Sequence, residues 1–224
     1  SGIASCTSLT YSGPDNAKAL VSGTCTDKAG NVGRASYRFA YDSTPPTIAS
    51  LSAQHGNRSV LLSWKASAGT RSLQVTRSSS GVHTVVYRGT GAEVRDTGLR
   101  VGAKYTYTVS AVDEAGNTSN ASVGITATGP LTSPVPGQTV SSRPHLTWLP
   151  VKGATYYNVQ LYRGGRILST WPKRTSITLP ASWSYQGHHH RLRGGSYRWY
   201  VWPGFGKKSH AHYGRLLGSS TFAR

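Results

Sequence analysis

The sequence predicts an all-β protein built from tandem β-sandwich domains. Apolar and polar residues alternate in short runs such as 60–64, 72–76 and 105–112, which is the pattern of half-buried strands. Gly, Ser and Thr residues separate these runs, and no segment shows sustained helical periodicity. At roughly 100 residues per sandwich, a chain of 224 residues has room for two or three domains.

Two proline-containing segments divide the chain. Thr44-Pro45-Pro46-Thr47 follows a strand-like run, and consecutive prolines end a strand because they cannot donate to its ladder. A second break, rich in Pro and Gly, covers residues 129–137. We therefore expect units at 1–45, 46–128 and 129–224.

The first unit holds only three expected strands, near Ala4–Leu9, Lys18–Thr26 and Arg34–Tyr41. An immunoglobulin-type sandwich has about seven strands, so one apolar face and both sheet edges would stay uncovered. Three explanations remain open: upstream chain has been removed, another molecule donates strands, or the unit is self-sufficient. Because the sequence contains no Met, we expect a mature product or a piece of a longer chain.

The two cysteines, Cys6 and Cys25, both lie in this first unit. In a Ser- and Gly-rich β protein, such a pair predicts a disulfide rather than two buried thiols. A disulfide indicates an oxidising, extracellular environment.

The middle unit carries the residues of a known domain family. Leu62-Ser63-Trp64 is followed by Leu99, Gly102, Tyr105, Tyr107, Val109, Ala111 and Asp113. This pattern resembles a fibronectin type III domain. The resemblance implies that Trp64 lies in the core on the second strand and that Tyr105 is the corner tyrosine of the sixth strand.

The last unit repeats this plan, since Leu146-Thr147-Trp148 parallels Leu62-Ser63-Trp64. It has a looser resemblance to fibronectin-like domains of actinobacterial surface proteins. We expect Trp148 in the core, and a closing strand near Leu216–Phe222.

The motif Asp-x-Ala-Gly-Asn occurs at Asp27–Asn31 and again at Asp113–Asn117. An Asp side chain can bond backbone N–H groups two residues on, so both copies predict hairpin turns. A calcium site on Asp27, Asp113 or Glu114 is the alternative, although oxygen ligands are few. The first copy, with Cys25 before it and Asp42-x-Thr44-Pro45-Pro46 after it, resembles the end of a bacterial Ig-like repeat.

The positive charge is concentrated at the C-terminal end. Net charge is +18, and residues 129–224 contain 13 Lys or Arg and no acid. This unit therefore cannot supply a carboxylate pair or a Ser-His-Asp triad. We find no motif of a known catalytic site or cofactor site in the chain, and we expect neither enzymatic activity nor a cofactor.

The histidines are weak candidates for a metal site. His188 and His190 can share one strand face, as can His210 and His212. If the two pairs met they could bind Zn²⁺ or Cu²⁺. Flanking cations and the lack of a nearby Cys or carboxylate favour solvated loop histidines, so we expect no metal.

Aromatic residues are dense in the last unit. Alternation places Tyr197, Trp199 and Val201 on one strand face, which we expect in the core. The other face would then expose a surface for docking or ligand binding, made of Trp171, Trp183, Arg198, Tyr200 and Trp202. Among the roles that this surface could have, we favour partner docking, followed by glycan contact, an internal cluster and binding of single-stranded nucleic acid.

These features favour a non-catalytic, secreted or cell-surface structural protein. We expect a stalk or a filament that assembles head-to-tail, with the cationic C-terminal unit docking on a second copy or another surface protein. Anionic polysaccharide is a further candidate partner, whereas no specific nucleic-acid module and no membrane span are present. The alternative function is a carbohydrate-binding accessory region of a larger secreted enzyme.

Overall fold

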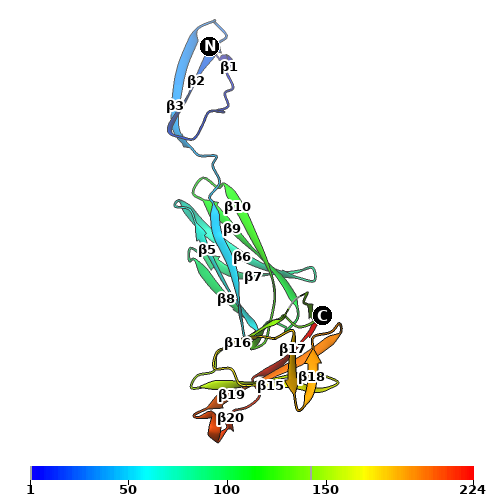
Figure 1. Cartoon of the computed structure of the whole chain (residues 1–224). Helices are drawn as coiled ribbons and strands as arrows, with labels where there is room; N and C mark the ends of the chain where they lie inside the picture. The colour runs from blue at the N-terminus through cyan, green and yellow to red at the C-terminus, as the bar shows by residue number, and fades with distance from the viewer. Residues whose placement is uncertain (1, 142) are drawn as a thin grey trace.

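The computed structural model describes residues 2–141 and 143–224. Figure 1 shows three units that follow one another along the chain. Hydrogen-bonded sheets join strands only within residues 3–41, 48–126 and 131–223. The expected all-β fold class is confirmed: a single sheet precedes two sandwiches in tandem.

The first unit is a three-stranded antiparallel sheet in the order β1-β2-β3. Its strands are β1 (Ile3–Cys6), β2 (Asn16–Asp27) and β3 (Val32–Tyr41). Cys6 lies opposite Cys25 in the β1–β2 register, and the two form the expected disulfide.

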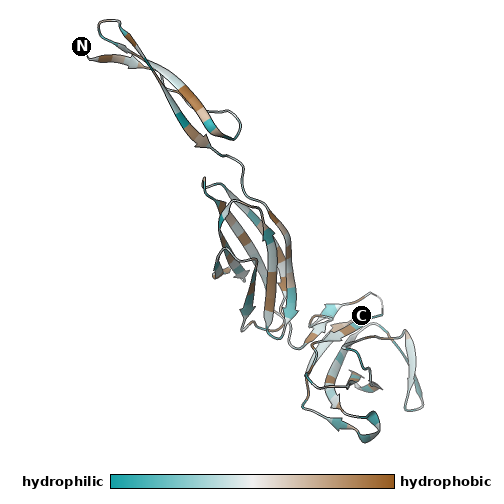
Figure 2. Ribbon diagram, turned by 90° about the vertical axis from the view of Figure 1, so that its left-hand side faces the viewer, coloured by the Kyte–Doolittle hydropathy of each residue, from teal (hydrophilic) through white to brown (hydrophobic). Residues whose placement is uncertain are grey.

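No second sheet covers the first unit within the described residues. Ala19 is buried there, whereas Tyr37 of β3 is 68% exposed. At one end of the sheet Tyr11 packs edge-on against Phe39 and Tyr41, with ring centroids 5.5 and 4.9 Å away. Figure 2 shows this unit as a single layer that carries apolar segments and has no layer opposite it.

The middle unit is a complete sandwich. One sheet has the order β4-β5-β8 and the other β10-β9-β6-β7. The strands are β4 (Ile48–Gly56), β5 (Ser59–Ala66), β6 (Thr70–Ser79), β7 (Val82–Gly89), β8 (Glu93–Thr97), β9 (Lys104–Asp113) and β10 (Thr118–Thr126).

The core of the middle unit is built by alternate residues of β5, β6 and β9. Trp64 is buried in it, as expected, and packs against Tyr87 at a centroid distance of 5.7 Å. The Tyr105 hydroxyl accepts a hydrogen bond from the Arg100 N–H at 3.1 Å, which is the geometry implied for a corner tyrosine.

A buried polar contact joins the two sheets of the middle unit. The Tyr107 hydroxyl of β9 donates to Asp96 Oδ2 of β8 at 2.7 Å, and Arg77 of β6 pairs with the same carboxylate at 2.9 Å. Burial, followed by the hydrogen bond to Asp96, raises the pKa of the Tyr107 phenol well above its usual range. Tyr107 therefore stays protonated and keeps donating at physiological pH.

Both Asp-x-Ala-Gly-Asn segments form the predicted hairpin turns. Asp27 Oδ1 accepts from the N–H groups of Ala29 and Asn31, each at 2.9 Å. Asp113 Oδ1 accepts from the N–H of Asn117 at 2.8 Å. The carboxylates are thus occupied by backbone donors within their own turns.

The last unit is a second sandwich with a small hairpin beside it. Its three-stranded sheet contains β11 (Leu131–Ser133), β13 (His145–Trp148) and β16 (Ser176–Thr178). Its six-stranded sheet contains β12 (Gln138–Thr139), β14 (Tyr156–Arg163), β15 (Gly165–Thr170), β19 (Ser196–Phe205), β20 (His212–Tyr213) and β21 (Gly218–Ala223). The hairpin is β17 (Ser182–Tyr185) with β18 (His188–Arg191), and the 3-10 turn η1 is Lys208–His210.

The core of this unit lies between its two sheets. Trp148 of β13 is buried, as expected, and meets Tyr157 and Trp199 of the larger sheet at centroid distances of 5.4 and 6.3 Å. Tyr197, Trp199 and Val201 are buried, which confirms the expected inner face of β19. The alternate residues of β19 therefore point away from the core.

Candidate functional site

The side of the large sheet that faces away from the core carries aromatic and polar side chains from β14 and β19. These strands pair in antiparallel register, with Tyr162 opposite Arg198, Gln160 opposite Tyr200 and Asn158 opposite Trp202. Residues directly opposite each other project from the same side of a sheet. The register therefore collects these side chains on one surface.

The aromatic rings of this surface form a row. The Tyr162 and Tyr200 rings meet edge-to-face at 5.3 Å, and the Tyr200 and Trp202 rings stack at 5.8 Å with 25° between their planes. All three side chains are half-buried. Because each ring supports the next, their orientations are restrained before any ligand arrives.

A chain of hydrogen bonds runs beside the rings. The Tyr162 hydroxyl donates to Gln160 Oε1 at 2.8 Å, Gln160 Nε2 donates to Asn158 Oδ1 at 2.7 Å, and Asn158 Nδ2 donates to Ser169 Oγ at 3.0 Å. The side chains in this chain point in fixed directions. The surface thus combines apolar rings with oriented amide and hydroxyl groups.

Trp171 marks the far end of the surface. Its indole is 38% exposed and donates from Nε1 to the Tyr213 hydroxyl at 2.7 Å. The Lys208 ammonium lies 4.9 Å from the Trp171 ring centroid, close enough for a cation–π contact. Trp171 is thus an exposed aromatic side chain held in one orientation.

A pocket of about 450 Å³ opens beside this indole. Its lining comes from the start of β14 and from the segments that follow β15 and β19: Thr155, Tyr156, Trp171, Lys173, Gly206, Lys207 and Lys208. Tyr156 packs edge-on against Tyr213 at 5.9 Å. Gly204 lies opposite both tyrosines, and a side chain at this position would collide with the Tyr156 ring.

We name the exposed and half-buried rings the aromatic face: Tyr162, Trp171, Tyr200, Trp202 and Tyr213. Tyr156 is only 3% exposed and supports the Tyr213 ring. Cations flank it at both ends, with Arg198 beside Tyr200 and Lys208 beside Trp171. The ion pairs of the described residues, Arg71–Glu114 and Arg77–Asp96, both lie in the middle unit. No carboxylate side chain of the last unit offsets this positive charge.

Trp183 does not belong to this surface, so its prediction as an exposed docking residue is wrong. The indole is 9% exposed, belongs to the core and donates from Nε1 to the Ile167 carbonyl oxygen at 2.6 Å. The β17–β18 hairpin turns this residue inward, where it closes one side of the core. Tyr200 and Trp202 are also less exposed than expected, because each ring covers part of the other.

The histidines lie on two separate elements. His188 and His190 belong to β18, where the His190 ring stacks on Trp183 at 6.0 Å. His210 ends η1, and His212 of β20 packs against Phe205. Across residues 2–141 and 143–224, no three His, Cys, Asp or Glu side chains are grouped so that they could hold a metal ion.

Sequence reasoning missed Tyr156, Tyr162 and Tyr213. Alternation along 156–162 could have placed Tyr156 and Tyr162 on one strand face. It could not have shown that β14 lies beside β19, nor that the short β20 brings Tyr213 next to Trp171.

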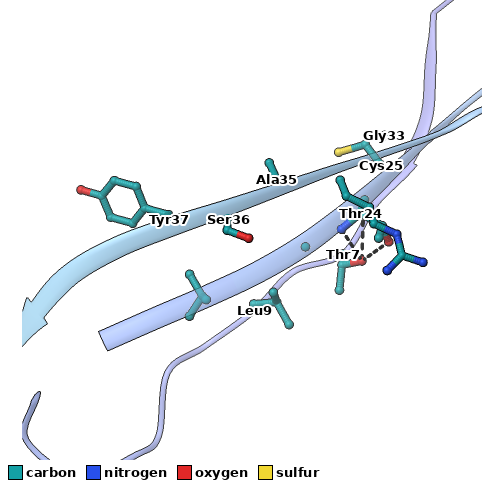
Figure 3. Close-up of a pocket in the computed structure, with 11 residues that line it drawn as sticks. Thr7, Leu9, Thr24, Cys25, Gly33, Ala35, Ser36 and Tyr37 are labelled. Carbon is teal, nitrogen blue, oxygen red and sulfur yellow. Dashed lines mark hydrogen bonds between the residues drawn. The ribbon is translucent and has the colours of Figure 1, made fainter. Parts of the chain in front are cut away.

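The first unit presents a different surface, an apolar pocket of about 650 Å³. Figure 3 shows Leu9 from the loop after β1, and Ala35 and Tyr37 from β3, along this pocket. Leu9 is 47% exposed. The predicted uncovered apolar face is therefore present in the structure.

Comparison with known proteins gives partial matches. No family model matches the chain. Amylopullulanase from Thermoanaerobacterium saccharolyticum is 39% identical over 90 residues, which cover 38% of this chain and 7% of that protein. The chain thus spans only a small part of this curated relative.

Two solved structures from chicken also match. A segment of two fibronectin type III domains from tenascin has a TM-score of 0.35 and 14% identity, and covers 79% of this chain and 99% of that one. The FN1–FN3 domains of CNTN1 have a TM-score of 0.35 and 15% identity, with 91% and 74% covered. Because both TM-scores are low, we assign the sandwich architecture from the sheets described above and not from these two structures.

Proposed function

We propose that this chain is a non-catalytic accessory region of an extracellular protein and that its last unit binds a polysaccharide through the aromatic face. The stacked pair Tyr200 and Trp202, on the outward side of a sheet, carries this proposal. Carbohydrate binding, the alternative expected from the sequence, is therefore the function that this surface supports best.

The chemistry of sugars matches this surface. The axial C–H bonds of a pyranose ring make one side of the sugar apolar, and that side packs well on an aromatic ring. The hydroxyl groups at the sugar edge then meet oriented polar partners, here the Gln160 amide and the Tyr162 hydroxyl, while the buried Asn158 holds Gln160 in place. A row of rings suits a polymer, because successive sugars can use successive rings.

Two further observations support the proposal. Amylopullulanase is named for its action on pullulan, a polysaccharide, and shares 39% identity with this chain over 90 residues. The Cys6–Cys25 disulfide is typical of proteins outside the cytoplasm.

In the described part of the chain, no helix has the length and apolar character that a bilayer crossing requires.

Titration with soluble polysaccharides tests the proposal. Pullulan and an acidic polysaccharide such as pectin are added while tryptophan fluorescence is followed, and saturable quenching is expected with one of them. Trp202→Ala and Tyr200→Ala should each weaken binding by about tenfold or more, because truncation removes a stacking platform. Tyr37→Ala removes an exposed tyrosine of the first unit and serves as the matched control.

Two results would contradict polysaccharide binding by this face. One is the absence of saturable quenching with both polymers. The other is an equal loss of affinity in Tyr37→Ala and Trp202→Ala.

A second candidate function is assembly of copies of this chain, and the uncovered apolar face of the first unit favours it. Exposed apolar surface and unpaired strand edges both promote contact with another chain. In the head-to-tail arrangement expected from the sequence, this face contacts the last unit of the next copy. Light scattering after size exclusion, at several concentrations, should then show mass growth that Leu9→Ser and Tyr37→Ser reduce. A monomer at every concentration would rule the assembly out.

A further inference from the structure

Four arginines line one pocket of the last unit, apart from the rings of the aromatic face. The pocket has a volume of about 540 Å³ and is lined by Arg143, Ala181, Arg191, Leu192, Arg193, Gly194 and Arg224. The arginines come from four places in the sequence: before β13, the end of β18, the segment before β19, and the residue after β21. Arg191 and Arg193 are neighbours in the sequence, and the tertiary fold brings Arg143 and Arg224 beside them.

Hydrogen bonds hold the walls of this arginine pocket. Arg224 and Gly195 exchange two backbone hydrogen bonds, of 2.9 and 3.0 Å. Arg224 Nη1 donates to the Leu192 carbonyl oxygen at 2.5 Å. The Tyr197 hydroxyl accepts from the Arg193 N–H at 2.8 Å and donates to the Arg193 carbonyl oxygen at 2.9 Å. The backbone of Arg193 and Arg224 is therefore held in place.

No Asp or Glu side chain offsets the charge of the pocket. No Asp or Glu lines it, and residues 129–224 contain none. All four arginines are exposed to solvent, and four positive charges around one pocket attract an anion. Each guanidinium also presents several N–H donors in a planar fork, a geometry that fits the oxygens of phosphate and sulfate.

We propose that the arginine pocket binds a tetrahedral oxyanion, the phosphate or sulfate group of an anionic ligand. This site is separate from the sugar-stacking rings, and the proposal does not depend on the proposed function. The two surfaces nevertheless adjoin. Arg163 Nη2 donates to the Gly194 carbonyl oxygen at 2.7 Å, and Arg163 lines a neighbouring pocket with Tyr162 and Tyr200.

Titration of the whole chain with inorganic phosphate and inorganic sulfate tests this proposal. Amide resonances of Leu192, Arg193 and Gly194 are followed by NMR, with sodium chloride of matched ionic strength as the reference. Saturable shifts at these amides are expected with phosphate, sulfate or both. Comparison of the phosphate titration with the sulfate titration shows which of the two oxyanions the pocket prefers.

Charge-matched variants separate a built site from general positive charge. Arg191→Gln with Arg193→Gln should weaken oxyanion binding by about tenfold or more, since charge-assisted hydrogen bonds are lost. Lys152→Gln with Arg174→Gln removes the same charge elsewhere in the unit and should leave binding unchanged. The thermal unfolding midpoint of each variant checks that the fold is intact.

Three results would overturn the proposal: chloride produces the same shifts as phosphate and sulfate, neither oxyanion produces saturable shifts at these amides, or both double variants weaken binding equally. Trp202→Ala should leave oxyanion binding unchanged. Failure of the arginine pocket can therefore be told apart from failure of polysaccharide binding.

Discussion

His55 lies on β4 with its Nδ1 buried and without a hydrogen-bond partner. Burial lowers the pKa of this imidazole below its ordinary value of 6.5. The unfolded chain therefore binds a proton at His55 more readily than the folded chain does. The contribution of His55 to stability is fully present above pH 6.5 and is lost as the pH falls toward the lower, folded-state pKa.

We predict that His55→Gln flattens the pH dependence of stability of the middle unit below neutrality. Urea denaturation at a series of pH values, compared between the wild type and the variant, measures the difference. His83→Gln is the matched control, because His83 is exposed on β7. Parallel pH profiles for all three proteins would show that His55 has no such role.

Single residues also show where sequence reasoning succeeds. Trp64 and Trp148 were placed in the core by their position in repeated Leu-x-Trp runs, and both are buried. Trp183 lies in no such run, and nothing local distinguishes it from Trp171. One is core and the other is exposed because the β17–β18 hairpin folds one of them inward.

At the scale of elements, the two Asp-x-Ala-Gly-Asn turns share the hydrogen bonds from Asn to Asp but have different surroundings. In both turns the Asn side chain also donates to the second carboxylate oxygen, at 2.9 Å for Asp27 and 3.0 Å for Asp113. Asp113 is buried and Asn117 donates from Nδ2 to the Asp42 carbonyl oxygen at 3.1 Å. The second turn thus also contacts the chain that leaves the first unit.

We predict that Asp113→Ala lowers the free energy of unfolding of the middle unit by about 1–3 kcal/mol, because the partly buried donors of Asn117 lose a charged acceptor. Glu114→Ala, at the exposed neighbouring position, should change it by about 0.5 kcal/mol or less. Hydrogen exchange at the amides of β9 and β10 reports the effect. Equal protection in the two variants would contradict the role of the turn.

The three units differ in how they are stabilised, which matters at the scale of the molecule. The two sandwiches have separate cores that share no residue. Among its described residues, the first unit has a disulfide and one buried apolar residue, Ala19, in place of such a core. We therefore expect the stability of the first unit to depend on its disulfide. The unfolding of the two sandwiches should not depend on that disulfide.

Reduction of Cys6–Cys25 tests this expectation. The chain-entropy model gives about 3 kcal/mol for a loop of this size, so amide protection in β2 and β3 should fall when reductant is added. All six tryptophans lie beyond residue 63, so the unfolding transitions seen by tryptophan fluorescence should not move. A shift of those transitions with reductant would show that the units are coupled.

By itself the sequence determined the main strands and the faces of β5, β9 and β19, the two Asp-x-Ala-Gly-Asn turns, the disulfide and the concentration of charge at one end. These properties are local, because alternation, Asp and Gly turn chemistry and residue counts act within a few residues. Only the tertiary structure decided that β14 lies beside β19, that Tyr213 supports Trp171, and that Arg143 and Arg224 share a pocket with Arg191 and Arg193. Pairing between distant strands depends on the total burial of the whole sheet, which no local pattern contains.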